Sequence, residues 1–190
     1  MNNEVLITKS FDILIEMLTD RGMDLTNVNK TVLCNSLITN SFINTTFKIQ
    51  IENIIVVYYL APKFRWLDLK KTIEESINES HSHILIVNDK ISLNNMKSIN
   101  STGINFQIIH IKELQFNISK SFLVPKHEKV DEMHVKTILD TFQLRNKSQL
   151  PTILKNDPMS RYMGLKFGDV IKVTRFSPSS GEYFVYRCCV

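Results

Sequence analysis

Apolar positions in the first sixty residues change from a helical spacing to a strand-like run. A helix over residues 10–20 is predicted by four apolar side chains at intervals of three and four, namely Phe11, Leu14, Ile15 and Leu18. Gly22 follows as a residue type that commonly ends a helix, and an asparagine-rich helix is expected over residues 28–38. Residues 54–60 are β-branched and aromatic without interruption, which is typical of a strand buried on both faces.

The same reasoning predicts alternating helices and strands up to residue 111. Helical spacing returns over residues 66–79, a buried strand is predicted over 83–87, a helix over 93–99 and a third strand over 106–111. Strands that alternate with helices usually form one sheet, with right-handed crossovers wherever neighbouring strands are parallel. The amino-terminal part is therefore predicted to be an α/β domain with three strands in one sheet.

A second, smaller domain is expected beyond this sheet, where Pro125 breaks the chain. We divide the chain into domains of residues 1–121 and 122–190. A helix that begins after Asp131 is predicted by an apolar stripe at Val135, Ile138, Leu139 and Phe142. Residues 150–154 are expected to form a short edge strand, because proline is tolerated at the edge of a sheet.

Proline and glycine stand at helix and turn positions in the carboxy-terminal stretch. Asp157 followed by Pro158 is a helix start, and Gly164 stands where the residue past a helix commonly turns left-handed. Turn residues at 177–181 separate two β-rich segments, which predicts a hairpin. The carboxy-terminal part is therefore predicted to be a compact α+β domain.

Composition favours a soluble, intracellular chain. The 190 residues are 43% hydrophobic, which is enough for a core, and the formal net charge of +4 is too small to make a strong nucleic-acid binder. The three cysteines form no C-x-x-C pair, which favours a reducing compartment. No apolar run approaches the roughly 20 residues that span a bilayer, so we expect no membrane partner.

No constellation of residues predicts an enzyme. The five histidines do not fall at zinc-ligand spacing with one another or with a cysteine, and neither a G-x-S-x-G elbow nor a glycine-rich phosphate loop is present in the sequence. The strands predicted at 54–60 and 84–87 carry no carboxylate that could hold Mg²⁺ as in a nuclease. We therefore expect no cofactor, no metal and no catalytic residue.

Motifs toward the carboxy terminus resemble a known family. They are L-V-P-K-H at 123–127, Q-L-P at 149–151, D-P-x-x-R-x-x-G-L-K at 157–166, G-D-V-I-K at 168–172 and G-x-Y-x-x-Y-R at 181–187. In this order they are similar to the assembly domain of the subunit common to eukaryotic nuclear RNA polymerases I, II and III, and to its small counterpart in archaeal RNA polymerase. Residues 11–23 and 113–119 look like the opening helix and closing strand of the jaw domain in the eukaryotic subunit.

The resemblance implies a non-catalytic subunit of a multisubunit DNA-dependent RNA polymerase. Its assembly domain would dock on the largest subunit beside other polymerase subunits. Carried over from the family's motifs, the expected partner-interface residues are Pro125, His127, Pro151, Asp157, Arg161, Arg175, Tyr183, Tyr186 and Arg187.

Two of these positions allow a more specific expectation. Arg161 can instead pair with Asp157 or Asp169 and hold the fold together. Spacing places Tyr183 and Tyr186 on opposite faces of the terminal strand, so that one packs inward and the other faces a partner.

The resemblance also implies that the jaw flanks downstream double-stranded DNA without recognising its sequence. The loop after the helix at 93–99 matches in order the family's DNA-facing loop. Its expected DNA-proximal residues are Lys97, Ser98, Asn100, Ser101 and Thr102. They can contact phosphate or sugar, but they include no arginine for bidentate base recognition.

Two other classes of function stay open at this point. One is a free-standing adaptor that binds transcription factors with the same fold, and the other is a metal-dependent nuclease-like enzyme. Abundant Asn, Ile and Lys and a shortened jaw favour a large cytoplasmic DNA virus or a fast-evolving eukaryote. The chain is therefore expected in the nucleus if it is cellular, and in the host cytoplasm and virion if it is viral.

Overall fold

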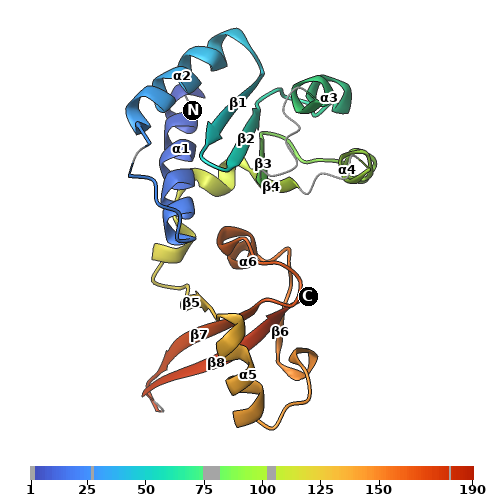
Figure 1. Ribbon diagram of the computed structural model, residues 1–190. Helices are drawn as coiled ribbons and strands as arrows, with labels where there is room; N and C mark the ends of the chain where they lie inside the picture. The colour runs from blue at the N-terminus through green and yellow to red at the C-terminus, as the bar shows by residue number, and fades with distance from the viewer. Residues whose placement is uncertain (1–2, 27, 75–81, 102–105, 180) are drawn as a thin grey trace. The chain divides into compact units, whose positions relative to one another are not determined.

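The computed structural model describes residues 3–26, 28–74, 82–101, 106–179 and 181–190. The chain divides into two compact units, Met1–Phe116 and Asn117–Val190 (Figure 1). No helix in the described part of the chain is both long and apolar enough to cross a membrane.

This division comes slightly earlier in the chain than the predicted one, which follows residue 121. The short helix η2 (Ile118–Lys120) contacts α6 (Pro158–Met163), and the Ser119 hydroxyl donates to that of Tyr162 at 3.5 Å. Residues 117–121 therefore belong to the second unit, because their contacts are made there.

The first unit is built around a four-stranded sheet in the order β1-β2-β3-β4 (Figure 1). Its strands are β1 (Thr46–Ile51), β2 (Ile54–Tyr59), β3 (Ser82–Val87) and β4 (Phe106–His110). The three predicted strands are parallel neighbours, whereas β1, which was not predicted, pairs antiparallel with β2. In β1 the exposed Lys48 and Gln50 alternate with buried residues, a strand pattern that the sequence analysis did not use.

Two pairs of helices lie on opposite faces of this sheet (Figure 1). They are α1 (Asn3–Asp20) with α2 (Lys30–Ile43), and α3 (Trp66–Glu74) with α4 (Leu93–Asn100). The helix α1 begins well before the predicted residue 10, because Ile7 extends its buried stripe by one turn. Residues 75–79, predicted to continue α3, lie outside the described residues.

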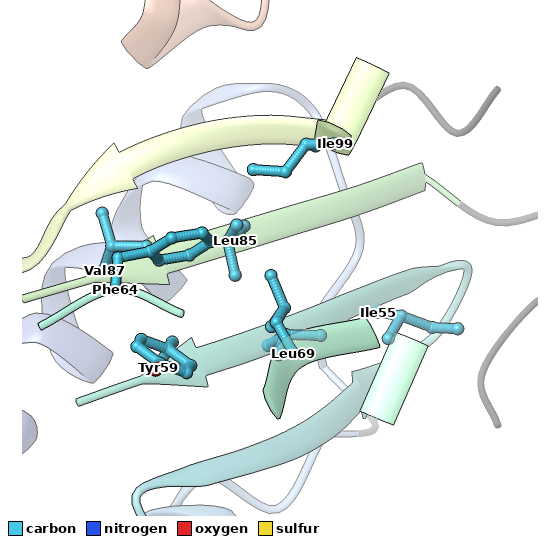
Figure 2. Packing of buried hydrophobic residues seen from close by; sticks show 8 residues of the cluster. Ile55, Tyr59, Phe64, Leu69, Leu85, Val87 and Ile99 are labelled. Carbon is cyan, nitrogen blue, oxygen red and sulfur yellow. The ribbon is translucent and has the colours of Figure 1, made fainter. Parts of the chain in front are cut away.

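Figure 2 shows the core between the sheet and the helices α3 and α4. Tyr59 and Leu85 from the central strands meet Leu69 of α3 and Ile99 of α4, and all four side chains are almost fully buried. Burial of one such side chain contributes about 1.5–3 kcal/mol, so this cluster holds the two crossover helices on the sheet.

The stretch expected to be a closing strand, residues 113–119, is helical instead. Most of it lies in two 3-10 helices, η1 (Ile111–Gln115) and η2, with residues 116 and 117 between them. The His110 ring accepts the Lys112 amide at 3.1 Å, and the Asn117 side chain accepts the Ser119 amide at 2.9 Å. Local side-chain bonds of this kind compete with strand pairing, which explains the difference.

The second unit contains a four-stranded sheet in the order β5-β7-β8-β6. Its strands are β5 (Lys126–Lys129), β6 (Thr152–Ile153), β7 (Val170–Ser177) and β8 (Gly181–Cys189). The predicted hairpin is confirmed as β7 and β8, and the predicted edge strand is the two-residue β6. The strand β5 was missed because its sequence, KHEK, contains no apolar residue.

The two faces of this sheet pack against different helices. Ile171 and Val173 point toward a core that includes Leu165, just past α6, and we call this side the α6 face. Val170 and Cys188 pack on the opposite side with Val135 of α5 (Glu132–Thr141), and we call it the α5 face. The mixed α+β class predicted for this unit is therefore confirmed.

The helix α5 is less covered than its apolar stripe predicts. Asp131 stands at its N-cap, as expected, but its side chain makes no capping hydrogen bond. Val135 is 1% exposed, whereas Phe142 is 53% exposed. The stripe prediction assumes a sheet under the whole helix, and here the buried contact is concentrated around Val135.

Candidate functional site

The helix α6 has both predicted ends. Asp157 Oδ1 accepts the Met159 amide at 2.9 Å, next to a proline in the first turn. Gly164 is left-handed, with φ 65° and ψ 36°, and the Leu165 amide donates to the Ser160 carbonyl at 2.9 Å. This is the longer bond of a Schellman cap. The aspartate and glycine of the motif therefore shape a helix.

Two further motif positions join strands together. Arg187 Nη1 donates to the Thr152 carbonyl at 3.2 Å, which ties β8 to β6. The Pro151 carbonyl accepts the Cys188 amide at 2.8 Å at the same edge. Both groups were predicted to contact a partner, but the bonds that the structure gives them are internal.

Asp169 organises the turn that leads into β7. Its Oδ2 accepts the Lys166 amide and the Lys129 ammonium, both at 2.7 Å. Asp169 is 20% exposed and Lys129 50% exposed, so this ion pair is partly screened and contributes up to about 1 kcal/mol. Arg161 lies half-buried in α6, and its pairing with Asp157 or Asp169 stays a prediction.

Besides Arg187, which is bonded to Thr152, the structure brings three predicted interface residues to one face of the hairpin. Arg175 pairs across the strands with Tyr183, and His127 pairs with Val173, so all three predicted residues lie on the α6 face. Arg175 is exposed and Tyr183 is 38% exposed. With the half-buried Val185 these residues form an open surface, which we call the hairpin patch: His127, Arg175, Tyr183 and Val185.

His127 is held in place by the residue that breaks the chain before β5. Its ring Nδ1 lies 2.6 Å from the Pro125 carbonyl, so Nδ1 carries the proton and donates. This bond leaves the other ring nitrogen, Nε2, as the acceptor of a neutral ring. Pro125 thus positions a predicted interface side chain.

Tyr186 lies on the other side of the sheet, as the spacing predicts. It pairs with Lys172 and packs half-buried against the α5 core, whereas Tyr183 stands on the α6 face. Its ring centroid lies 5.6 Å from that of Phe184 and 6.0 Å from that of Phe142. Sequence reasoning placed Phe142 in the buried stripe of a helix and did not single out Phe184, although both are 53% exposed.

The net positive charge of the chain comes from its second unit. Residues 117–190 contain 12 Lys and Arg against 7 Asp and Glu, whereas residues 1–116 contain 11 against 12. The division predicted from the sequence, after residue 121, gives the same asymmetry. It favours an acidic protein surface as the partner of the second unit.

The predicted DNA-proximal residues lie at the end of α4. Lys97 is exposed in its last turn, while the hydroxyls of Ser98 and Ser101 donate to the Asn94 and Ser98 carbonyls at 3.2 and 2.7 Å. A helix carboxy terminus repels anions, so Lys97 is the group here that favours a phosphate. Asn100 is the last residue of α4, and Thr102 lies outside the described residues.

Two of the three cysteines, Cys188 and Cys189, are buried at the end of β8. Burial raises the pKa of Cys188 and of Cys189, which disfavours the thiolate at neutral pH. Among the residues that the structure describes, no three His, Cys, Asp or Glu side chains are grouped so that they could hold a metal ion.

Comparison with known proteins places the motif residues in a family. Residues 116–189 match the model of "RNA polymerase Rpb5, C-terminal domain". This match covers the second unit almost from end to end, including the α6 cap, the hairpin patch and the α5 face.

Individual relatives extend the likeness. The chain is 30% identical over 143 residues to DNA-directed RNA polymerase subunit 5-like protein 1 of Arabidopsis thaliana, covering 73% of this chain and 68% of the relative. It is 42% identical over 78 residues to subunit rpabc1 of DNA-directed RNA polymerases I, II, and III of Dictyostelium discoideum, covering 41% and 39%. It is 40% identical over 76 residues to DNA-directed RNA polymerase subunit Rpo5 of Pyrococcus horikoshii, covering 40% of this chain and 92% of the relative.

The extent of these matches differs between the two units. Some alignments span less than half of the relative's own length, whereas the archaeal relative is covered almost completely. The Arabidopsis alignment is longer than the second unit, so it includes part of the first. The chain therefore belongs to the Rpb5 family of RNA polymerase subunits.

Proposed function

We propose that this chain is a non-catalytic subunit of a multisubunit DNA-dependent RNA polymerase. The second unit is its assembly domain and docks on the largest subunit, beside other polymerase subunits. The first unit is its jaw and flanks downstream double-stranded DNA. Family membership supports the polymerase assignment, because the relatives carry the names of polymerase subunits.

The observation that carries the docking proposal is the hairpin patch. Arg175 and Tyr183 are cross-strand neighbours on an open face, and Tyr and Arg are the residue types that most often anchor interfaces. The positive charge of the unit favours a partner surface rich in Asp and Glu. Docking through the α6 face of the hairpin accounts for both features.

For the jaw we propose a contact with the DNA backbone through Lys97. This residue is exposed, and its ammonium offsets the unfavourable end of α4. One lysine in a unit with a slight acidic excess supplies a weak, salt-sensitive contact that is the same for every base sequence. Such a contact suits a polymerase that moves along DNA.

For the location we propose the nucleus of a eukaryotic cell. The relatives named above come from a plant, a slime mould and an archaeon, so their names do not support the viral alternative. Two of them belong to eukaryotes.

The test is recovery of the tagged full-length chain from its own cells. We expect it in a complex of several hundred kilodaltons that elongates RNA and contains the largest subunit. The double variant Arg175→Glu with Tyr183→Ala should recover at least about tenfold less of that subunit, since it removes two anchors and reverses one charge.

A matched control keeps the chemical change and moves it away from the patch. Arg145→Glu with Phe167→Ala also reverses one exposed arginine and removes one exposed aromatic ring in the same unit. Docking through the hairpin patch would be supported if the control recovers a normal amount of the largest subunit and the first variant does not. Recovery of the wild-type chain only as a free monomer would contradict the polymerase assignment and favour an adaptor.

A further inference from the structure

A groove runs along the α5 face of the second unit, on the side of the sheet opposite the hairpin patch. It has a volume of about 560 Å³. One wall is the side of α5 that carries His134, Ile138 and Phe142, and the floor is formed by Lys172, Phe184 and Tyr186 of β7 and β8. None of these residues belongs to the hairpin patch, because Tyr186 lies on the opposite face of the sheet.

The groove exists because α5 packs over only one end of this sheet face. The contacts of α5 with Val170, Cys188 and Leu150 hold it over one end of the sheet. Toward the hairpin tip the same face continues with Lys172 and Phe184, which α5 leaves accessible. Sheet faces in α+β domains are normally covered by a helical layer, so half of that layer is missing here.

The exposed side chains in the groove are large and aromatic. Tyr186 stacks edge-on between Phe142 and Phe184, and the Lys172 ammonium lies 4.9 Å from the Phe184 ring centroid. Phe142 and Phe184 are each 53% exposed. Neighbouring exposed aromatic residues on a monomer commonly mark a binding surface.

The shape of the groove fits a helix lying beside α5. The helical wall contributes His134, Thr137, Ile138 and Thr141, which lie on one side of α5. Side chains at such spacings form a ridge that packs into the groove of a neighbouring helix. The floor is the face of the inner strands β7 and β8, so an added strand would find backbone partners only along the outer edge of β5 and not on the floor.

The charges around the groove favour an acidic occupant. The Glu128 carboxylate is already paired with Lys126 at 2.6 Å, and Lys129 with Asp169 at 2.7 Å. The other acidic residue of the lining, Asp131, lies 3.9 Å from the His134 ring. Lys172 lies over the aromatic floor, in a unit with 12 basic against 7 acidic residues. A carboxylate on the occupant can therefore pair with Lys172 while an apolar side chain enters beside Phe184.

We propose that this groove binds an amphipathic α-helix of a partner protein, with apolar residues at spacings of three and four flanked by Asp or Glu. The helix completes the layer over the α5 face. Because the groove and the hairpin patch lie on opposite faces of the sheet, both can be occupied at once. The proposal does not depend on which protein docks at the hairpin patch.

The test uses the full-length chain and a fluorescein-labelled synthetic peptide of about five helical turns. Its leucines are spaced three and four apart and its remaining positions are Glu and Ala. A second peptide has the same composition in scrambled order. In fluorescence anisotropy titrations we expect the patterned peptide to bind at least about tenfold more tightly than the scrambled one.

Variants locate the binding and exclude a loss of fold. Phe184→Ala should weaken binding of the patterned peptide about tenfold or more. Phe167→Ala removes a 70% exposed ring outside the groove and should leave the binding affinity unchanged. Lys172→Glu should weaken the Glu peptide and strengthen a peptide with Lys at those positions, which mere destabilisation cannot do. Thermal melts of each variant accompany the titrations.

Three results would overturn the proposal. They are equal affinity for the patterned and scrambled peptides, an unchanged affinity with Phe184→Ala, and the absence of the charge preference with Lys172→Glu. Dimerisation of the free chain in sedimentation, lost with Phe184→Ala, would show that a second copy occupies the groove instead.

Discussion

Replacement of Gly164 by valine is expected to destabilise the second unit. At φ 65° the Cβ of an L-residue approaches the following carbonyl oxygen, which costs about 1–2 kcal/mol, and a β-branched side chain adds crowding. Relief of that strain would require another backbone conformation, which breaks the bond from the Leu165 amide to Ser160 and moves a side chain that is 4% exposed. We therefore expect a loss of at least about 1 kcal/mol.

The magnitude can be measured by calorimetry of the full-length chain. For a unit of this size, 1 kcal/mol corresponds to a shift in Tm of about 4–8 °C. The chain has one tryptophan, Trp66, which lies in the first unit, so its fluorescence gives an internal reference for the part without the substitution. Gly164→Asn is the matched control, since asparagine visits the left-handed region at much lower cost.

Two outcomes would refute this reasoning. A calorimetric transition unchanged by Gly164→Val would show that the cap is not under conformational constraint. Equal losses for valine and asparagine would show that the cost arises from side-chain volume and not from the backbone angle.

Three further outcomes are expected. Lys97→Glu with Ser101→Asp should weaken the assembled polymerase's hold on downstream duplex equally for every sequence and most at low salt, measured by competition binding; a sequence-dependent loss would contradict a backbone contact. Burial raises the pKa of Tyr58 far above its usual 10.0, so the folded state loses stability as the pH rises above about 10. Tyr58→Phe should reduce that loss by up to about 1.4 kcal/mol per pH unit, measured by urea titrations at several pH values. A fragment of residues 122–190 should unfold cooperatively and bind the largest subunit in a pull-down. If only a fragment of residues 117–190 folds and binds, the contact of Ser119 with Tyr162 is required for folding of this unit.

Elements with a strong local signal were predictable from the sequence. The continuous apolar run of β2 and the Asp-Pro start and Gly end of α6 are confirmed, because each depends on residues close together in the chain. Elements without such a signal were missed. The strand β5 consists of charged residues and a histidine, and it forms because β7 supplies its hydrogen-bond partners.

The same distinction applies to the candidate site. Sequence motifs proposed nine interface residues, but only strand register shows that His127, Arg175 and Tyr183 share a face while Tyr186 does not. Arg187 and Asp157 looked like binding groups, and their bonds in the structure are to the fold itself. A side chain's role depends on neighbours distant in sequence, which local patterns do not contain.

By itself the sequence determined the family, the α/β and α+β classes of the two parts, and the ends of α6, since these follow from residue type, spacing and motif order. Tertiary structure alone decided the fourth strand of each sheet and the partly covered α5 face. The physical reason is where α5 lies on the sheet. An apolar stripe shows that a helix can be buried, but the sheet beneath it determines how much of the stripe is covered and what remains open to a partner.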